Sequence, residues 1–155
     1  MQNPRVVVTG LGVCAPNGVG VPAFKEAIEA GKSGIRFYSE LEKLKFSCQI
    51  GGMPLISEAV KSKYFTPLQL RNFNAAGILY GVAAGVEAWQ DAGLEIDEDH
   101  CDFDSGTIFG VGTLGVDKYR ESIYKVDEGN TRRLGSTSVQ QTMSSGVSAY
   151  LGGML

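Results

Sequence analysis

Three glycines, Gly77, Gly81 and Gly85, lie at intervals of four residues inside the longest apolar segment of the sequence. Residues 74–93 carry apolar side chains at helical spacing and end on Gly93, which predicts a long buried helix. Each interior glycine costs such a helix up to ~1 kcal/mol relative to alanine. We expect another backbone to lie close against the glycine stripe, because packing must compensate for this cost.

Two further segments predict strands that are buried on both faces. Residues 5–11 (RVVVTGL) form a continuous β-branched run, and residues 106–111 (GTIFGV) follow an acidic stretch at 95–104. Strands that alternate with helices in this way indicate an α/β fold with a layered sheet. The remaining expected elements are a loop at 12–20, a helix that Pro22 begins and Gly31 ends, a short strand at 46–51, helices at 57–63, 116–126 and 139–151, and a polar loop at 127–137.

Charge and cysteine content exclude several classes of protein. Lys and Arg number 14 against 17 Asp and Glu, so the chain offers no basic face for nucleic acid. Cys14, Cys48 and Cys101 are scattered without a CxxC pair, which predicts no metal site and favours a reducing cytoplasm. No signal peptide is visible, and the longest apolar run, 12 residues at 75–86, is too short to span a membrane.

Two stretches imitate the glycine fingerprint of dinucleotide-binding proteins. Residues 10–15 match GxGxxA and residues 110–115 match GxGxxG. In the first copy, PNG at 16–18 interrupts the position where the helix should begin. In the second, a polar loop stands where a strand ending in an acidic residue is required. Tight turns at strand ends explain both stretches better, and a small nucleotide-binding module remains an alternative.

No complete catalytic apparatus is recognisable among the residues. Lys32 and Ser33 resemble the end of a phosphate-binding loop, but they follow the end of a helix, where the dipole repels phosphate. His100, the single histidine, lies in an acidic linker. Ser144 and Ser145 lack the GxSxG elbow and a second histidine that could activate them.

Five motifs taken in order are more specific than any one of them. They are RVVVTGLG at 5–12 followed by PNG at 16–18, AGKSGI at 30–35, AAGVEAWQDAGL at 83–94, GVGTLG at 110–115 and MSSG at 143–146. This series resembles the opening of the elongating β-ketoacyl-acyl-carrier-protein synthases, the condensing enzymes of fatty-acid synthesis. The resemblance covers essentially the whole chain but well under half of a family member. Residues 1–155 are therefore expected to form an incomplete N-terminal thiolase-like half that ends before the nucleophile strand.

The resemblance implies a thiolase-type fold of two similar αβαβα halves, usually paired as a homodimer. In the reaction it implies, a cysteine takes an acyl group from acyl-carrier protein. Malonyl-carrier protein is then decarboxylated with the help of two histidines, and the carbanion attacks the acyl thioester. None of these residues maps onto Cys14, Cys48, Cys101 or His100. We therefore expect no catalytic residue and no cofactor in this chain, which alone should be inactive.

The resemblance also implies where substrate is bound. The glycine-rich loop would form one wall of the acyl pocket through Gly112, Thr113 and Leu114, with Met143 nearby, and residues 137–150 would supply interface surface. The partners implied are acyl-carrier protein, acyl and malonyl thioesters, and a second copy or the rest of the same fold. Three departures separate this chain from the common pattern, which has aspartate, isoleucine and asparagine where Ala75, Thr113 and Thr142 stand. They favour either altered acyl selectivity or a non-catalytic partner that resembles a chain-length factor.

Overall fold

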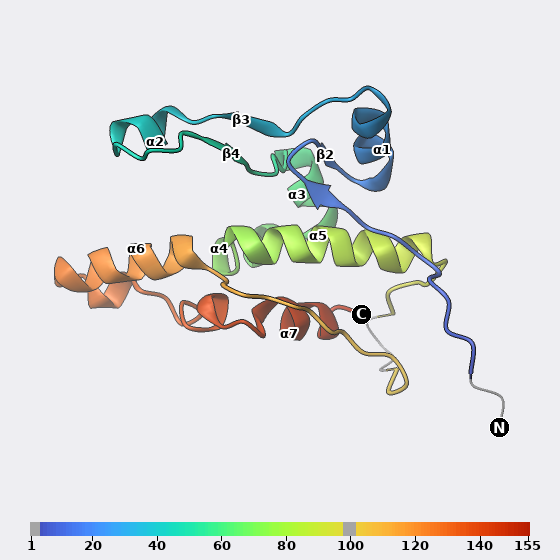
Figure 1. Cartoon of the computed structure of the whole chain (residues 1–155). Helices are drawn as coiled ribbons and strands as arrows, with labels where there is room; N and C mark the ends of the chain where they lie inside the picture. Colours follow the sequence, from blue (N-terminus) through green and yellow to red (C-terminus); the bar gives the residue numbers. More distant parts are fainter. Residues whose placement is uncertain (1–3, 98–101) are drawn as a thin grey trace.

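The long helix α5 (Ala76–Asp91) runs through the middle of the molecule in this computed structural model, which describes residues 4–97 and 102–155. Figure 1 shows the N-terminal hairpins and first helices on one side of α5 and the C-terminal helix on the other. The elements before α5 are β1 (Cys14–Ala15), β2 (Gly18–Val19), α1 (Val21–Glu29), β3 (Ile35–Phe37), α2 (Ser39–Lys43), β4 (Ile50–Gly52), α3 (Glu58–Tyr64) and α4 (Pro67–Asn72). Those after it are α6 (Val116–Asp127), the 3-10 turns η1 (Thr131–Arg133) and η2 (Gln140–Thr142), and α7 (Gly146–Gly152).

Side chains of the hydrophobic core pack directly against the glycine stripe of α5. A Cβ atom added at Gly77, Gly81 or Gly85 would come within 3.0 Å of a side chain that packs on the stripe. The three side chains that fill this space, in the same order along α5, are those of Leu114, Val147 and Leu151. Full burial of an aliphatic side chain contributes roughly 1.5–3 kcal/mol, which exceeds the ~1 kcal/mol that each glycine costs the helix. The predicted helix and its close packing are confirmed, although side chains fill the stripe where backbone was expected.

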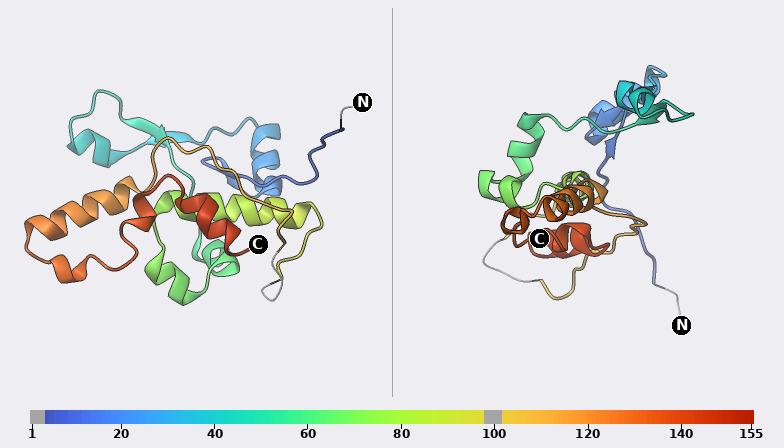
Figure 2. Two further views of the ribbon diagram at one scale, coloured as in Figure 1. Left: turned by 90° about the horizontal axis from the view of Figure 1, so that it is seen from below. Right: turned by 90° about the vertical axis from the view of Figure 1, so that its left-hand side faces the viewer.

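The N-terminal segment lies against the C-terminal half of α5 (Figures 1 and 2). A Cβ atom at Gly10 or Gly12 would collide with the carbonyl oxygens of Ala88 and Ala84, so only glycine lets the two backbones meet.

Two carboxylates of α5 then accept hydrogen bonds from this segment and from the start of α1. Asp91 Oδ2 accepts from the Leu11 N–H at 2.8 Å. The two oxygens of Glu87 accept from the N–H groups of Val13 (2.9 Å) and Val21 (2.7 Å). We call these three bonds from Glu87 and Asp91 the carboxylate clamp.

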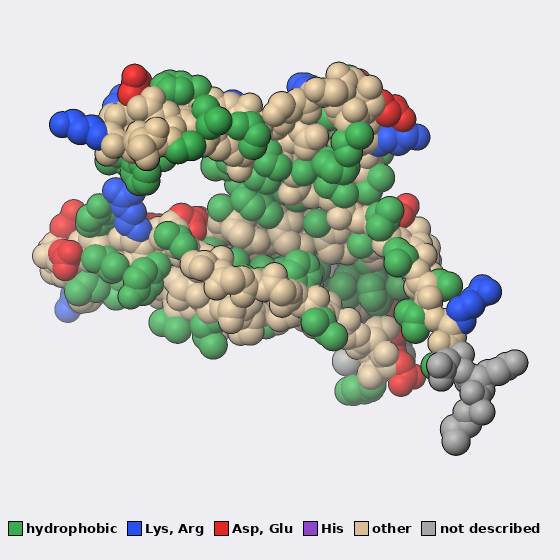
Figure 3. Space-filling view, in the orientation of Figure 1, with side chains coloured by type: hydrophobic (Ala, Val, Ile, Leu, Met, Phe, Trp, Pro, Cys, Tyr) green, Lys and Arg blue, Asp and Glu red, His purple; other side chains and the backbone are tan. Residues whose placement is uncertain are grey.

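Two small antiparallel hairpins are the paired strands in the described part of the chain. In the first, β1 and β2 pair Cys14 with Val19 and Ala15 with Gly18, so the predicted loop at 12–20 contains a tight hairpin. In the second, β3 and β4 pair Ile35 with Gly52. The short strand expected at 46–51 therefore begins later than predicted. Figure 3 shows exposed hydrophobic side chains on the layer that these hairpins form above α5.

The buried strands predicted at 5–11 and 106–111 are wrong. Neither segment is a strand in the structure, and Val6 and Ile108 are 91% and 99% exposed. A strand exists only where its backbone N–H and C=O groups bond to a neighbouring strand. No described residue provides such a neighbour for these two segments. The apolar pattern of the two segments indicates that their side chains should be buried, but it does not specify which part of the protein packs against them.

The helices agree better with the sequence. The helices expected at 22–31, 57–63, 74–93 and 116–126 are confirmed as α1, α3, α5 and α6, with ends shifted by a few residues. The single helix expected at 139–151 is wrong, because η2 ends at Thr142, Met143 is extended and α7 begins only at Gly146. Helix α4 is an addition, begun by Thr66 and Gln69 in a reciprocal capping box. No helix in residues 4–97 or 102–155 is long and apolar enough to cross a membrane.

Candidate functional site

The glycine-rich loop that leads into α6 is exposed at its first residues and packed against the core at its last ones. Gly112 and Thr113 are exposed, and nothing lies within 4 Å of a Cβ added at Gly112. Leu114, in contrast, is buried against Gly77 and Gly146. Gly115 has φ 64°, a left-handed conformation that favours glycine, and is the N-cap of α6. The loop therefore presents Thr113 at the surface from a backbone that is anchored directly after it.

Met143, the fourth predicted pocket residue, lies on the segment that contacts this anchor. A Cβ atom at Gly115 would collide with the carbonyl oxygen of Gln141 and come within 3.0 Å of Thr142 Cα. The loop and the connection between η2 and α7 are therefore in backbone contact, and Met143, 51% exposed, lies next to that contact. The structure thus brings the two predicted wall segments together, but Leu114 belongs to the core and does not face open space.

Gln141 is a further residue of this region, and no sequence motif points to it. It is 5% exposed and is the buried polar side chain among the described residues. Its Oε1 accepts hydrogen bonds from the N–H groups of Asn74 (2.8 Å) and Ala75 (2.9 Å). The available signal was a glutamine inside a segment interpreted as an apolar helix face, where a polar group needs a partner.

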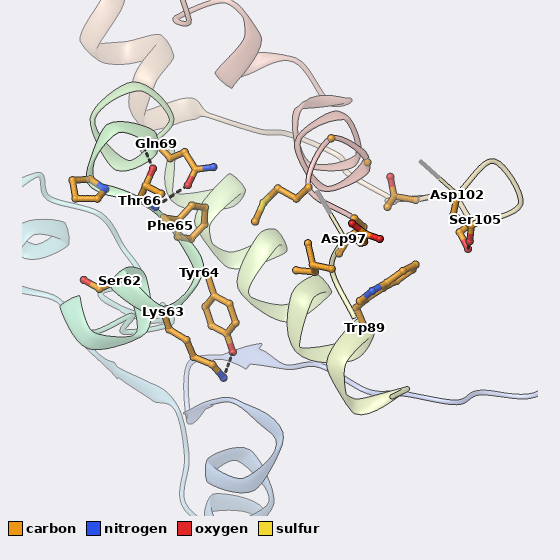
Figure 4. Close-up of a pocket in the computed structure, with 18 residues that line it drawn as sticks. Ser62, Lys63, Tyr64, Phe65, Thr66, Gln69, Trp89, Asp97, Asp102 and Ser105 are labelled. Atoms are coloured by element: carbon orange, nitrogen blue, oxygen red, sulfur yellow. Dashed lines mark hydrogen bonds between the residues drawn. The ribbon is translucent and has the colours of Figure 1, made fainter. Parts of the chain in front are cut away.

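Two hollows of the structure differ in their position and character. The larger, about 980 Å³, lies among the α3–α4 junction, the end of α5, residues 105–107 and the last four residues. Figure 4 shows Tyr64 and Phe65 on one side of it and Trp89 on the other, with Lys63 donating a hydrogen bond to the Tyr64 hydroxyl at 3.0 Å. None of the four predicted pocket residues lines it. The smaller, about 500 Å³, is a mainly apolar groove between α6 and residues 134–142 that reaches Thr142, beside Met143.

The other candidate nucleophiles and ligands do not assemble into a site. Burial and the nearby Glu87 carboxylate raise the pKa of the Cys14 thiol to about 11, so it is protonated near neutral pH. Cys48 is exposed, and Ser144 and Ser145 are exposed without a histidine beside them in the described residues. Cys101 and His100 lie outside the described residues. No group of three or more potential metal ligands occurs within residues 4–97 and 102–155.

The first glycine fingerprint does not have the geometry of a nucleotide site. Gly10 and Gly12 face the backbone of α5, which occupies the space that a pyrophosphate would need. The tight-turn interpretation of this copy is also wrong, because the glycines serve close packing along a helix. In the second copy Gly110 and Gly112 are open, and Asp117 lies in the first turn of α6.

Comparison with known proteins assigns the family. The model of the β-ketoacyl synthase N-terminal domain matches residues 3–154. The chain belongs to this family. The 3-oxoacyl-[acyl-carrier-protein] synthase 2 of Vibrio harveyi is 30% identical over 97% of this chain and 35% of its own length. The ketoacyl synthase alpha and beta subunits of the tetracenomycin polyketide synthase of Streptomyces glaucescens are 32% and 31% identical, over 84% and 78% of this chain and 30% and 29% of their own lengths.

Solved ketosynthase structures share the fold. A β-ketoacyl synthase from Burkholderia phymatum superposes with a TM-score of 0.77 at 21% identity, over 97% of this chain and 37% of that one. The ishigamide ketosynthase/chain length factor gives 0.68 at 22% identity, over 96% and 37%. The predicted family and thiolase-like α/β fold are confirmed. The ketosynthase-like chain spans about a third of the length of the relatives it matches.

Proposed function

We propose that this chain is the N-terminal portion of a 3-oxoacyl-[acyl-carrier-protein] synthase, which condenses an acyl thioester with malonyl-acyl-carrier protein in fatty-acid or polyketide synthesis. The observation that carries the proposal is the match of residues 3–154 to the ketosynthase N-terminal domain. On this proposal residues 1–155 are an incomplete thiolase-like half. Acyl-carrier protein is the partner, a homodimer or pairing with the rest of the fold completes the structure, and the protein works in the cytoplasm.

The chain's own contribution to the reaction would be the wall of the acyl pocket. The loop at Gly112 and Thr113 is open on its outer side and anchored by Leu114 and Gly115 on its inner side. A rigid backbone with a small exposed side chain suits a surface against which an alkyl chain lies. None of Cys14, Cys48 and Cys101 matches the nucleophile of the family, and the Cys14 thiol is protonated near neutral pH. On this proposal the attacking thiolate and the histidine donors would therefore come from residues after Leu155.

A second candidate function is a non-catalytic, chain-length-factor-like partner subunit. Its support is the nearly equal identity to the alpha and the beta subunit of one polyketide synthase. The reading frame after codon 155 distinguishes the two candidates. Because a buried strand usually runs about five or six residues, a nucleophile should appear on the order of ten residues after Leu155. Cysteine there supports the condensing enzyme and glutamine or another residue the partner subunit, whereas a stop codon with no companion chain opposes both.

The pocket wall is tested by Thr113→Phe in a protein that also contains the downstream half. The phenyl ring would occupy space in front of the loop, so the longest accepted acyl chains should be lost first and the shortest retained. Product chain lengths are measured by mass spectrometry of the acyl-carrier-protein thioesters. Thr131→Phe, at an exposed threonine of η1, is the matched control. An unchanged chain-length profile in the Thr113 variant would oppose the placement of this residue.

A further inference from the structure

Helix α5 begins without a cap from its own sequence. The first N–H groups of a helix have no partner within it, and a Ser, Thr, Asp or Asn at the N-cap normally supplies one. The N-cap of α5 is Ala75, which has no side-chain acceptor and is completely buried, so water cannot substitute. The start of the most buried helix therefore requires acceptors from elsewhere in the chain.

Gln141 supplies the acceptor for the N–H of the N-cap, Ala75, and also for the N–H of the preceding Asn74, from 66 and 67 residues away. Its Oε1 accepts from Asn74 N–H and Ala75 N–H, at 2.8 and 2.9 Å. Its Nε2 donates to the Asn72 carbonyl at 3.0 Å and to Thr137 Oγ1 at 3.3 Å. Two accepted and two donated bonds satisfy every hydrogen-bonding position of a glutamine amide. The side chain is thus fixed in one orientation and joins residues 72–75 to residues 137–141.

The backbone of Gln141 adds a third segment to this junction. Its carbonyl oxygen lies against Gly115, where any Cβ would collide with it. The Asp117 carboxylate, at the start of α6, accepts a hydrogen bond from Ala76 N–H at 3.1 Å, so α6 is also joined to the start of α5. The beginning of α5, the glycine-rich loop and the η2 turn therefore meet around one buried amide.

We propose that Gln141 is a positioning residue that holds the loop at Gly112 and Thr113, and the neighbouring Met143, in a fixed relation to α5. The inference rests on the proposed function only in calling this loop the pocket wall. A side chain that merely capped α5 would affect residues 72–76 alone. A positioning residue controls the loop at 112–116 as well, although its side chain makes no bond to that loop.

Hydrogen exchange of the 155-residue chain, followed by mass spectrometry, tests the proposal. In Gln141→Met, which retains length and loses all four bonds, amides of 72–76 and of 112–116 should exchange on the order of tenfold or more faster. Exchange in α1 and α3 should stay unchanged. Gln141→Glu keeps the acceptor oxygen but places a second oxygen against the Asn72 carbonyl, so it should also accelerate exchange in the same two segments. Gln140→Met is the matched control, because Gln140 is exposed on the same turn, and it should change neither segment.

Three results would overturn the proposal. Acceleration confined to 72–76 would reduce Gln141 to a helix cap, and an equal effect of Gln140→Met would remove its special role. Loss of protection throughout the chain in both Gln141 variants would show general destabilisation without any selective hold on the loop. No acyl substrate enters this experiment, so its failure is distinct from failure of the proposed function, which the downstream reading frame decides.

Discussion

Replacing Gly12 by alanine should destabilise the protein, while the same change at Gly112 should not. The two glycines occupy the same place in the two GxG stretches, yet their surroundings are opposite. A Cβ at Gly12 would meet the carbonyl oxygen of Ala84, a backbone atom that cannot turn aside. Nothing lies within 4 Å of a Cβ at Gly112.

The size of the effect follows from the carboxylate clamp. To relieve the collision, the N-terminal segment must withdraw from α5 by about 1 Å or more. The bonds that join Leu11 N–H to Asp91 and Val13 N–H to Glu87, at 2.8 and 2.9 Å, would then exceed hydrogen-bonding distance. A hydrogen bond to a charged group contributes ~1.5–3 kcal/mol, less where it is exposed, so we expect a loss of roughly 2–4 kcal/mol. Gly112→Ala should stay within about 0.5 kcal/mol of the parent.

Urea unfolding measured by the fluorescence of Trp89 provides the assay. Trp89 is the single tryptophan of the chain, lies on α5 and donates its indole N–H to the Glu95 carbonyl at 3.0 Å. Its emission therefore reports on the helix that carries the clamp. A Gly12→Ala protein within 0.5 kcal/mol of the parent would refute the reasoning. So would equal losses at Gly12 and Gly112, since a shared role of the two glycine stretches would then be the better explanation.

Three further outcomes are expected. Incubation of the 155-residue chain with acyl-acyl-carrier protein should leave no acyl-enzyme thioester in mass spectra, because none of its cysteines matches the nucleophile of the family and the Cys14 thiol is protonated near neutral pH; a stable thioester on any cysteine would contradict this. The chain alone should self-associate in analytical ultracentrifugation through unpaired segments such as those around Val6 and Ile108, and a stable monomer would contradict it. Hydrogen bonds from two lysines lower the pKa of Glu121 from 4.5 to about 2. The contribution of Glu121 to the free energy of unfolding is therefore complete above pH 4.5 and is lost as the pH falls toward 2. Because this ion pair is exposed, Glu121→Gln should cost no more than about 1 kcal/mol in urea unfolding at pH 7, with no added loss in acid.

The central helix could be predicted from sequence because its pattern is local. Apolar positions at helical spacing, the glycine stripe and the closing Gly93 all lie within residues 74–93, and α5 follows them closely. The segments at 5–11 and 106–111 show the opposite case. Their β-branched residues indicate a need for burial, but a strand also needs a bonded neighbour, and the identity of that neighbour is not written in the segment itself.

The candidate site could be predicted only in outline. The motif indicates the glycine-rich loop, whereas Gln141 lies within a segment whose pattern predicts a continuous helix. Its role depends on residues 66 positions earlier that come close only after folding. The break at Met143 is equally hard to predict, because it follows the η2 turn, which contains Gln141 and its bonds to the start of α5.

The carboxylate clamp has a consequence for how freely the N-terminal segment can change in sequence. Glu87 and Asp91 bond to the main-chain N–H groups of Leu11, Val13 and Val21 and ignore their side chains. Nineteen of the twenty amino acids supply that N–H, so most replacements at these three positions leave the hydrogen bonds to α5 intact. Proline alone lacks the N–H donor, so proline at any of these three positions would remove the hydrogen bond made there to α5. Variation can therefore accumulate on one side of this contact while the two acidic residues on the other side must stay.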